Sequence, residues 1–311
     1  MLQSQPITHP GLRPRLARRK ARAIGSPAGW FILPAILVLV GVDLGPMLYS
    51  MSASLTHWML TDPGSENDPA GLSNYVDVLT SPDFWAAVRV TVTYAILSIA
   101  GALGLGLGFA MLLNLEFYAR PVFRSIMMIP MVVTPVVVGI FWKLLYEQEN
   151  GVFNWALQSV GLPKVAWLGT TMALPSVVIM DIWHSTPFFM LVLLAGLQSV
   201  DAGQLDAAKV DGASRLQVFR FIIVPHLLPY MLIAASFRAI SAMSDFDKIW
   251  MLTAGGPGNS TTMITLYTFQ TGFSAFDIGR VAAIAWIFVV TVIVVSSPLL
   301  YHLFRNAQAE R

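Results

Sequence analysis

Residues 199–225 read SVDAGQLDAAKVDGASRLQVFRFIIVP, a stretch too strongly patterned for a plain tether. Its first part, around Ala207 and Ala208, favours a short helix. Gly212 then permits a break or a left-handed turn, because glycine has no side chain to clash in that conformation. A second apolar helix begins over 216–223. The stretch therefore predicts a helix-turn-helix element with apolar side chains offered to something outside it.

The chain around this element is made of long apolar segments. Of its 311 residues, 56% are hydrophobic and 12% are charged, whereas charged residues make up about a quarter of a soluble domain. No segment shows the alternating pattern of barrel strands, and several reach the roughly 20 residues that a helix needs to cross a bilayer. The fold class is therefore all-α, a polytopic membrane protein with six transmembrane helices. The spans are predicted at Trp30 to Ser54, Phe84 to Leu115, Ser125 to Tyr146, Ala173 to Leu197, His226 to Leu252 and Ala282 to Phe304.

The distribution of Lys and Arg orients these spans, because cytoplasmic segments carry an excess of both. Basic residues crowd the chain before Trp30, whereas residues 55–84 contain acids but neither Lys nor Arg. Both termini are therefore predicted in the cytoplasm. The expected divisions are a basic tail at 1–28, a six-helix domain at 29–305 with a cytoplasmic loop at 199–225, and a cytoplasmic tail at 306–311.

Several kinds of chemistry find no support in the sequence. Cysteine is absent, which excludes disulfides and thiol chemistry. No Walker sequence occurs, so the chain is not expected to hydrolyse nucleotide alone. The scattered histidines provide neither a metal site nor the base of a membrane-embedded hydrolase. We expect a non-catalytic subunit without cofactor or metal. Its basic N-terminus would meet membrane lipid rather than nucleic acid.

A family resemblance rests on ten positions of the 199–225 loop. They resemble the EAA loop of binding-protein-dependent ABC importer permeases, with Asp206 and Val224 in place of the usual Glu and Leu. The resemblance implies a MetI-like permease fold in a bacterial inner membrane. It also implies that the loop docks as a coupling helix into a cytoplasmic ATPase. The residues expected to couple are Asp206, Ala207, Ala208, Asp211, Gly212, Ala213 and Phe219, and the pattern ends on Ile222, Val224 and Pro225.

The same resemblance implies a set of partners. They are a second homologous permease subunit, two ATPase subunits that bind ATP and Mg, and an extracytoplasmic substrate-binding protein. The stretch from Ser241 to Phe273, SAMSDFDKIWMLTAGGPGNSTTMITLYTFQTGF, is similar to carbohydrate-uptake permeases of the MalF and UgpA type. A sugar or polyol importer is therefore expected, and an importer of glycerol-3-phosphate or glycerophosphodiesters stays open.

Candidate pathway residues are the ionisable side chains at membrane depth and the aromatic residues beside them. Such charges are costly in a bilayer and usually face the bundle interior or a wet cavity. The candidates are Asp181, Trp183, His184, Asp245, Phe246 and Asp247. One alternative is that the acids only form interior ion pairs, for instance with Arg238 or Arg280. Another is an ion-coupled secondary transporter, which would need inverted repeats that are not evident.

Overall fold

The computed structural model describes residues 27–309, with side chains from Trp30 to Val294, and divides the chain into the units Met1–Ser50 and Met51–Arg311. The N-terminal unit is helical throughout its described part. It contains α1 (Pro27–Leu39), a π-helical turn (Val40–Leu44) and the start of α2 (Gly45–Ala53). The helix from Trp30 to Ala53 is long and apolar enough to cross a membrane, as the first predicted span requires.

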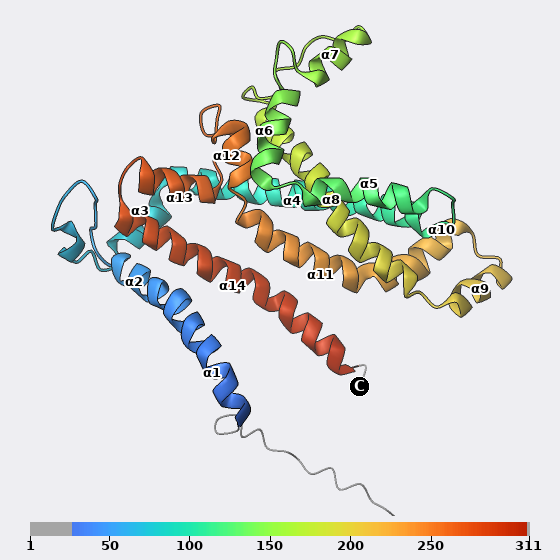
Figure 1. Cartoon of the computed structure of the whole chain (residues 1–311), viewed down its shortest axis with the longest axis horizontal. Coiled ribbons are helices and arrows are strands. Elements are labelled where there is room, and N and C mark those ends of the chain that lie inside the picture. The colour runs from blue at the N-terminus through green and yellow to red at the C-terminus, as the bar shows by residue number, and fades with distance from the viewer. Residues whose placement is uncertain (1–26, 310–311) are drawn as a thin grey trace, which may run out of the picture. The chain divides into compact units, whose positions relative to one another are not determined.

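The second unit is also built of helices, drawn in Figure 1. Within the described residues the only β-type pairing is two isolated bridges, so the all-α prediction is confirmed. Its elements are a 3-10 turn (Ser65–Asn67), α3 (Ser73–Thr80), α4 (Pro82–Asn114), α5 (Arg120–Val132), α6 (Pro135–Leu145), α7 (Val152–Ser159), α8 (Ala173–Gln198), α9 (Ala202–Val210), α10 (Arg215–Val218), a π-helical turn (Phe219–Ile223), α11 (Val224–Met243), α12 (Asp247–Thr253), α13 (Ile264–Phe273) and α14 (Ile278–Ala309).

Two of the predicted spans need correction. The span predicted from Ser125 to Tyr146 is two helices, α5 and α6, which meet at an angle of 99°. Val133 and Thr134 are extended between them, and proline lies on each side of this elbow, so the helical hydrogen bonds cannot continue through it. The fifth span ends at Met243 rather than Leu252, and a separate short helix, α12, follows.

The number of spans is consistent with six. Four helices of the described chain satisfy the length and composition of a spanning helix, and the bent pair α5–α6 makes a fifth candidate. The described apolar part of α14, Ile278–Val294, is shorter than a full span.

The contact between α4 and α8 forms the centre of the second unit. Gly106 lets the two helices approach closely, since a Cβ there would lie 2.6 Å from Phe189 Cβ and 2.9 Å from the Met190 nitrogen. Gly101 is similarly crowded by Ile182, whereas Gly104 and Gly108 face open space. Small residues at a helix contact are the usual means of close packing in a membrane.

Candidate coupling hairpin and pathway residues

The predicted helix-turn-helix is present as α9, a tight turn and α10. Gly212 has a φ of +72°, a conformation in which a side chain would be strained. Around it the Ala213 N–H donates to Ala208 O at 2.9 Å, and the Gly212 N–H donates to Lys209 O at 3.1 Å. These two bonds make a Schellman motif, which closes the end of α9.

The second arm of this hairpin is fixed by its own cap. The Ser214 hydroxyl accepts from the Gln217 N–H, and the Gln217 side chain accepts from the Ser214 N–H at 2.7 Å, so the first turn of α10 has a capping box. Pro225 lies in the first turn of α11 and does not interrupt the path from this arm into the next span. α10, the π-helical turn and α11 form one run from Arg215 to Met243 that meets the criteria for a single spanning helix.

Most of the candidate coupling residues lie on the outside of the hairpin. Asp206, Ala207, Asp211 and Gly212 are exposed, Ala213 and Phe219 are half-buried, and only Ala208 is buried. Asp206 and Lys209 pair at 2.8 Å with 70% and 74% of their side chains exposed. A hollow of about 320 Å³ lies beside the turn, between Gly212 and Phe221. The hairpin therefore offers both a projecting surface and a recess.

The candidate acid Asp181 lies in a closed cluster of four charges. Its carboxylate is fully buried and accepts from Arg238 Nη2 at 2.7 Å and from Lys248 Nζ. Asp245 Oδ2 accepts from the same Arg238 atom at 2.8 Å and forms an ion pair with Lys248 Nζ at 3.0 Å. Two carboxylates thus face two cations, which leaves the cluster neutral.

Hydroxyl groups of α4 complete this cluster. Tyr94 donates to Asp245 Oδ2 at 2.7 Å, and Ser98 donates to Asp181 Oδ2. Among the described residues, the interior ion pairs expected from the sequence are therefore present for Arg238 but not for Arg280, which instead donates to the Asp77 carbonyl at 3.5 Å. Asp181 has no exposed surface, and Asp245 keeps 16% of its side chain exposed.

Comparisons with known proteins agree with these features. The family model described as "Binding-protein-dependent transport system inner membrane component" matches residues 100–308. The probable ABC transporter permease protein y4oQ of Sinorhizobium fredii is 55% identical over 94% of this chain and 95% of its own length. The chain belongs to this family of ABC transporter permeases. It is therefore a multi-pass inner-membrane component.

Two further relatives extend the comparison. The trehalose/maltose transport system permease protein MalF of Thermococcus litoralis is 39% identical over 77% of this chain and 81% of its own. A chain in the crystal structure of a bacterial ABC transporter involved in alginate import matches with a TM-score of 0.76. It is 22% identical and covers 89% of the permease and 95% of that chain. This structural likeness supports the permease fold.

Trp183 and His184 of the permease have different surroundings from Asp181. Trp183 packs edge-on against Trp142, with ring centroids 5.6 Å apart, and both line a groove of about 690 Å³ along α4, α5, α6 and α8. His184 Nε2 lies 3.3 Å from the Val133 carbonyl at the α5–α6 elbow. Because that carbonyl only accepts, the imidazole must donate, and His184 holds the elbow against α8.

Phe246 and Asp247 lie next to the charge cluster but point elsewhere. Phe246 stacks on Trp250 and packs against Phe269, which in turn stacks on Phe273. Asp247 is exposed at the start of α12. Of the six pathway candidates, the structure thus brings Asp181 and Asp245 together and leaves the other four outside their cluster.

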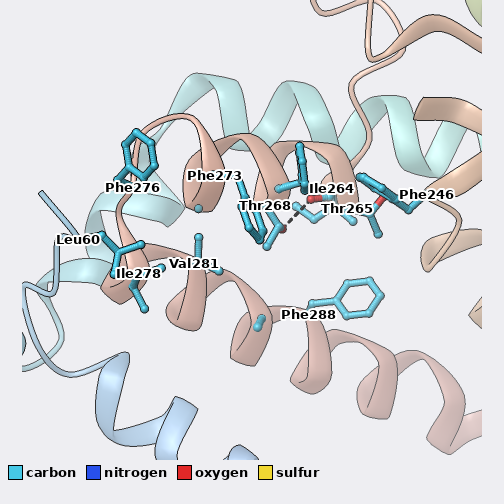
Figure 2. Close-up of a pocket in the computed structure, with 13 residues that line it drawn as sticks. Leu60, Phe246, Ile264, Thr265, Thr268, Phe273, Phe276, Ile278, Val281 and Phe288 are labelled. Atoms are coloured by element: carbon cyan, nitrogen blue, oxygen red, sulfur yellow. Dashed lines mark hydrogen bonds between the residues drawn. The ribbon is translucent and has the colours of Figure 1, made fainter. Parts of the chain in front are cut away.

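The Phe246 side chain also borders an apolar groove of about 490 Å³ between α13 and α14, shown in Figure 2. Val281 and Ile278 of α14 face Thr268 and Phe273 of α13 across it. The Thr268 hydroxyl donates to the Ile264 carbonyl at 2.7 Å and the Thr265 hydroxyl to the Asp245 carbonyl at 2.8 Å. Both hydroxyl protons are engaged, so these two threonines can only accept from a hydroxylated ligand, and most of the other side chains that line the groove are apolar.

Lys248, Tyr94 and Ser98 belong to the cluster but were not among the candidate residues predicted from the sequence. A partial signal was present, because Lys248 follows Asp245 by three positions. Charges at that spacing can meet on one helical face, and neutral pairing is expected when charges are buried. Ser98 and Tyr94 carried no comparable signal, since hydroxyl residues are common in membrane helices.

Proposed function

We propose that this permease forms part of the pathway by which an ATP-driven importer carries a sugar or polyol across the inner membrane. The observation that carries the proposal is the projecting hairpin of α9 and α10, with Asp206 and Asp211 exposed and the turn fixed by Gly212. A rigid, exposed element between two long helices is suited to receive motion from a soluble partner. In Figure 1 it lies at one end of α4, α8 and α11, with α12 and α13 near the other.

The substrate class is supported by two observations. The chain is 39% identical to a permease named for trehalose and maltose transport. It also carries the Leu-Thr-x-Gly-Gly-Pro stretch, Leu252 to Pro257. We expect a second permease subunit, two ATPases that bind ATP and Mg, and an extracytoplasmic binding protein as partners, with both termini in the cytoplasm.

The pathway wall is proposed to include Trp183 and Asp245. Trp183 offers an aromatic face on an open groove, and aromatic faces stack well on the C–H faces of sugars. Asp245 is the only acid of the charge cluster with exposed surface, and only its Oδ2 receives the cluster's hydrogen bonds. Asp181 is proposed to have an indirect role, because it is buried and balances the charges of Arg238 and Lys248. His184, Phe246 and Asp247 stay predictions as pathway residues.

The test is ATP-dependent uptake in vesicles that contain the permease with its partner permease, ATPases and binding protein. Gly212→Pro should abolish uptake and substrate-stimulated ATP hydrolysis, because proline cannot adopt the φ of +72° and the hairpin would lose its shape. Radiolabelled maltose, trehalose and glycerol-3-phosphate, each offered with its own binding protein, would separate the substrate classes.

Gly161→Pro is the matched control. Gly161 has a φ of +80°, open space around it and an N–H that donates to the carbonyl three residues earlier at 3.0 Å, as Gly212 does at 3.1 Å. It ends α7 instead of α9, so the same backbone damage falls on another loop. Uptake driven by an ion gradient in the permease alone, unaffected by Gly212→Pro, would overturn the proposal.

A further inference from the structure

The base of the hairpin is closed by a hydrogen-bond cluster that joins its two ends. Ser199 ends α8 just before the hairpin, and His226 and Tyr230 lie one turn apart at the start of α11 just after it. The Ser199 hydroxyl lies 2.9 Å from His226 Nε2 and 3.0 Å from the Tyr230 hydroxyl. We refer to Ser199, His226 and Tyr230 as the staple.

The hydrogen atoms of the staple can be assigned by counting donors. A serine hydroxyl has one proton to donate and two lone pairs that accept. Ser199 lies 2.8 Å from the Gly196 carbonyl, which can only accept, so its proton goes there. The two remaining contacts must then be donated by the His226 N–H and the Tyr230 O–H. All three bonds are satisfied at once. Because Ser199 is exposed, water can take the place of a lost partner, but the link between α8 and α11 is then broken.

The backbones of α8 and α11 pack closely beside the staple. A Cβ on Gly196 would lie 2.7 Å from Leu227 Cδ2 and 2.9 Å from Tyr230 Cγ, so α8 and α11 touch there without room for a side chain. The rings of His226 and Tyr230 lie 6.0 Å apart, and Leu227 between them is fully buried. The staple therefore lies beside a tightly packed contact, with Ser199 exposed and His226 and Tyr230 half-buried.

The α9 arm of the hairpin has little besides the staple to hold it to α8, whereas the α10 arm continues into α11 as one helix. Ala208 is the only buried residue of α9, and it bonds within the hairpin, to Ala213. Only Val200 and Asp201 connect Ser199 to α9. A push on α9 would reach α11 through the continuous helix that begins at Arg215, but without the staple it would reach α8 only through Val200 and Asp201.

We propose that Ser199, His226 and Tyr230 are positioning residues that transmit motion of the α9–α10 hairpin to α8 and α11 together. This inference rests on the proposed role of the hairpin in docking to an ATPase. The staple contacts neither substrate nor nucleotide. The staple links the two ends of the hairpin by hydrogen bonds, so that α8 and α11 move together when the ATPases close.

The test is the number of substrate molecules taken up per ATP hydrolysed in the reconstituted complex, with Ser199→Ala and Tyr230→Phe. Tyr230→Phe removes one hydrogen bond of the staple and should lower this ratio about fivefold, while ATP hydrolysis and the amount of ATPase bound stay near wild type. Ser199→Ala removes the bonds from both His226 and Tyr230 and should lower the ratio at least as much. The double variant should be no worse than Ser199→Ala alone, because that substitution already removes the bond to Tyr230. Ser199→Thr keeps the hydroxyl and should restore the ratio.

Ser236→Ala is the control, because its hydroxyl bonds only within its own helix, to Leu232 O. An unchanged ratio in both staple variants would overturn the inference, as would a ratio lowered equally by Ser236→Ala. A fall of uptake, hydrolysis and assembled complex in parallel would also overturn it, since that would show a role in stability alone. Failure of the proposed function is distinguishable, because Gly212→Pro would then leave ATPase binding and uptake intact whatever the staple variants do.

Discussion

Because the buried cluster is neutral, removal of any one of its charges should destabilise the folded protein. Asp181 is fully buried and bonded to both Arg238 and Lys248, so Asp181→Asn leaves two cations facing one carboxylate. An uncompensated buried charge typically costs ~3–5 kcal/mol. We expect the permease to lose about that much stability, measured as thermal unfolding in detergent.

A second substitution in the cluster distinguishes the effect of the lost charge from the effect of the changed side-chain shape. Lys248→Met in the Asp181→Asn background removes the surplus cation, so the double variant should be more stable than Asp181→Asn alone. Asp247→Asn is the control, because Asp247 is exposed and its loss should change stability by no more than about 0.5 kcal/mol. Equal stability of Asp181→Asn and wild type would refute the account of the cluster.

Unlike the buried cluster, the exposed ion pair Asp206–Lys209 should contribute little to the stability of the fold. Both side chains are largely exposed, and such pairs are worth roughly 0–1 kcal/mol. Asp206→Ala should therefore leave thermal stability nearly unchanged but weaken capture of the ATPase subunits in a pull-down, if this carboxylate docks. Lys209→Ala breaks the same ion pair and serves as the control. A matching loss of capture in both variants would show that the ion pair, and not the Asp206 carboxylate, matters.

At the scale of the element, the contact of α4 with α8 sets how close two helices lie. Gly106→Ala would place a Cβ 2.6 Å from Phe189 Cβ, and overpacking of a tight core costs about 1–3 kcal/mol. Gly104→Ala lies two residues away on the same helix with nothing within 4 Å, so it should be neutral or slightly stabilising. Thermal unfolding of the two variants provides the comparison, and equal effects would contradict the packing argument.

Some of the helical elements could be predicted from the sequence and others could not. The hairpin was predicted because its signals are local, with Gly212 and its neighbours lying within a few positions of one another. The elbow between α5 and α6 was missed, although Pro130 and Pro135 flank it, because a hydropathy window averages across such a bend. The charge cluster could not be assembled from spacing, since Asp181 and Arg238 lie 57 positions apart and only the packing of α8 against α11 brings them together.

At the scale of the whole molecule, the elbow has a consequence for topology. A bent pair of helices either crosses the membrane as a broken span or enters and returns on the same side. If α5 and α6 cross, the loop that holds Glu149 lies outside and the α9–α10 hairpin lies inside. If they return, both change sides. The scarcity of Lys and Arg in that loop, where Lys164 is the only one, favours crossing.

Because the chain contains no cysteine, the side of the membrane on which each loop lies can be measured by labelling single introduced cysteines. Single cysteines at Asp62, Glu116, Glu149 and Lys209 would all replace exposed charged side chains. In intact cells a membrane-impermeant maleimide should label positions 62 and 149, and should reach 116 and 209 only after the membrane is permeabilised. Labelling of 116 without permeabilisation would reverse the predicted orientation. Positions 116 and 149 on one side would show that α5 and α6 return, and would place the hairpin away from any cytoplasmic ATPase.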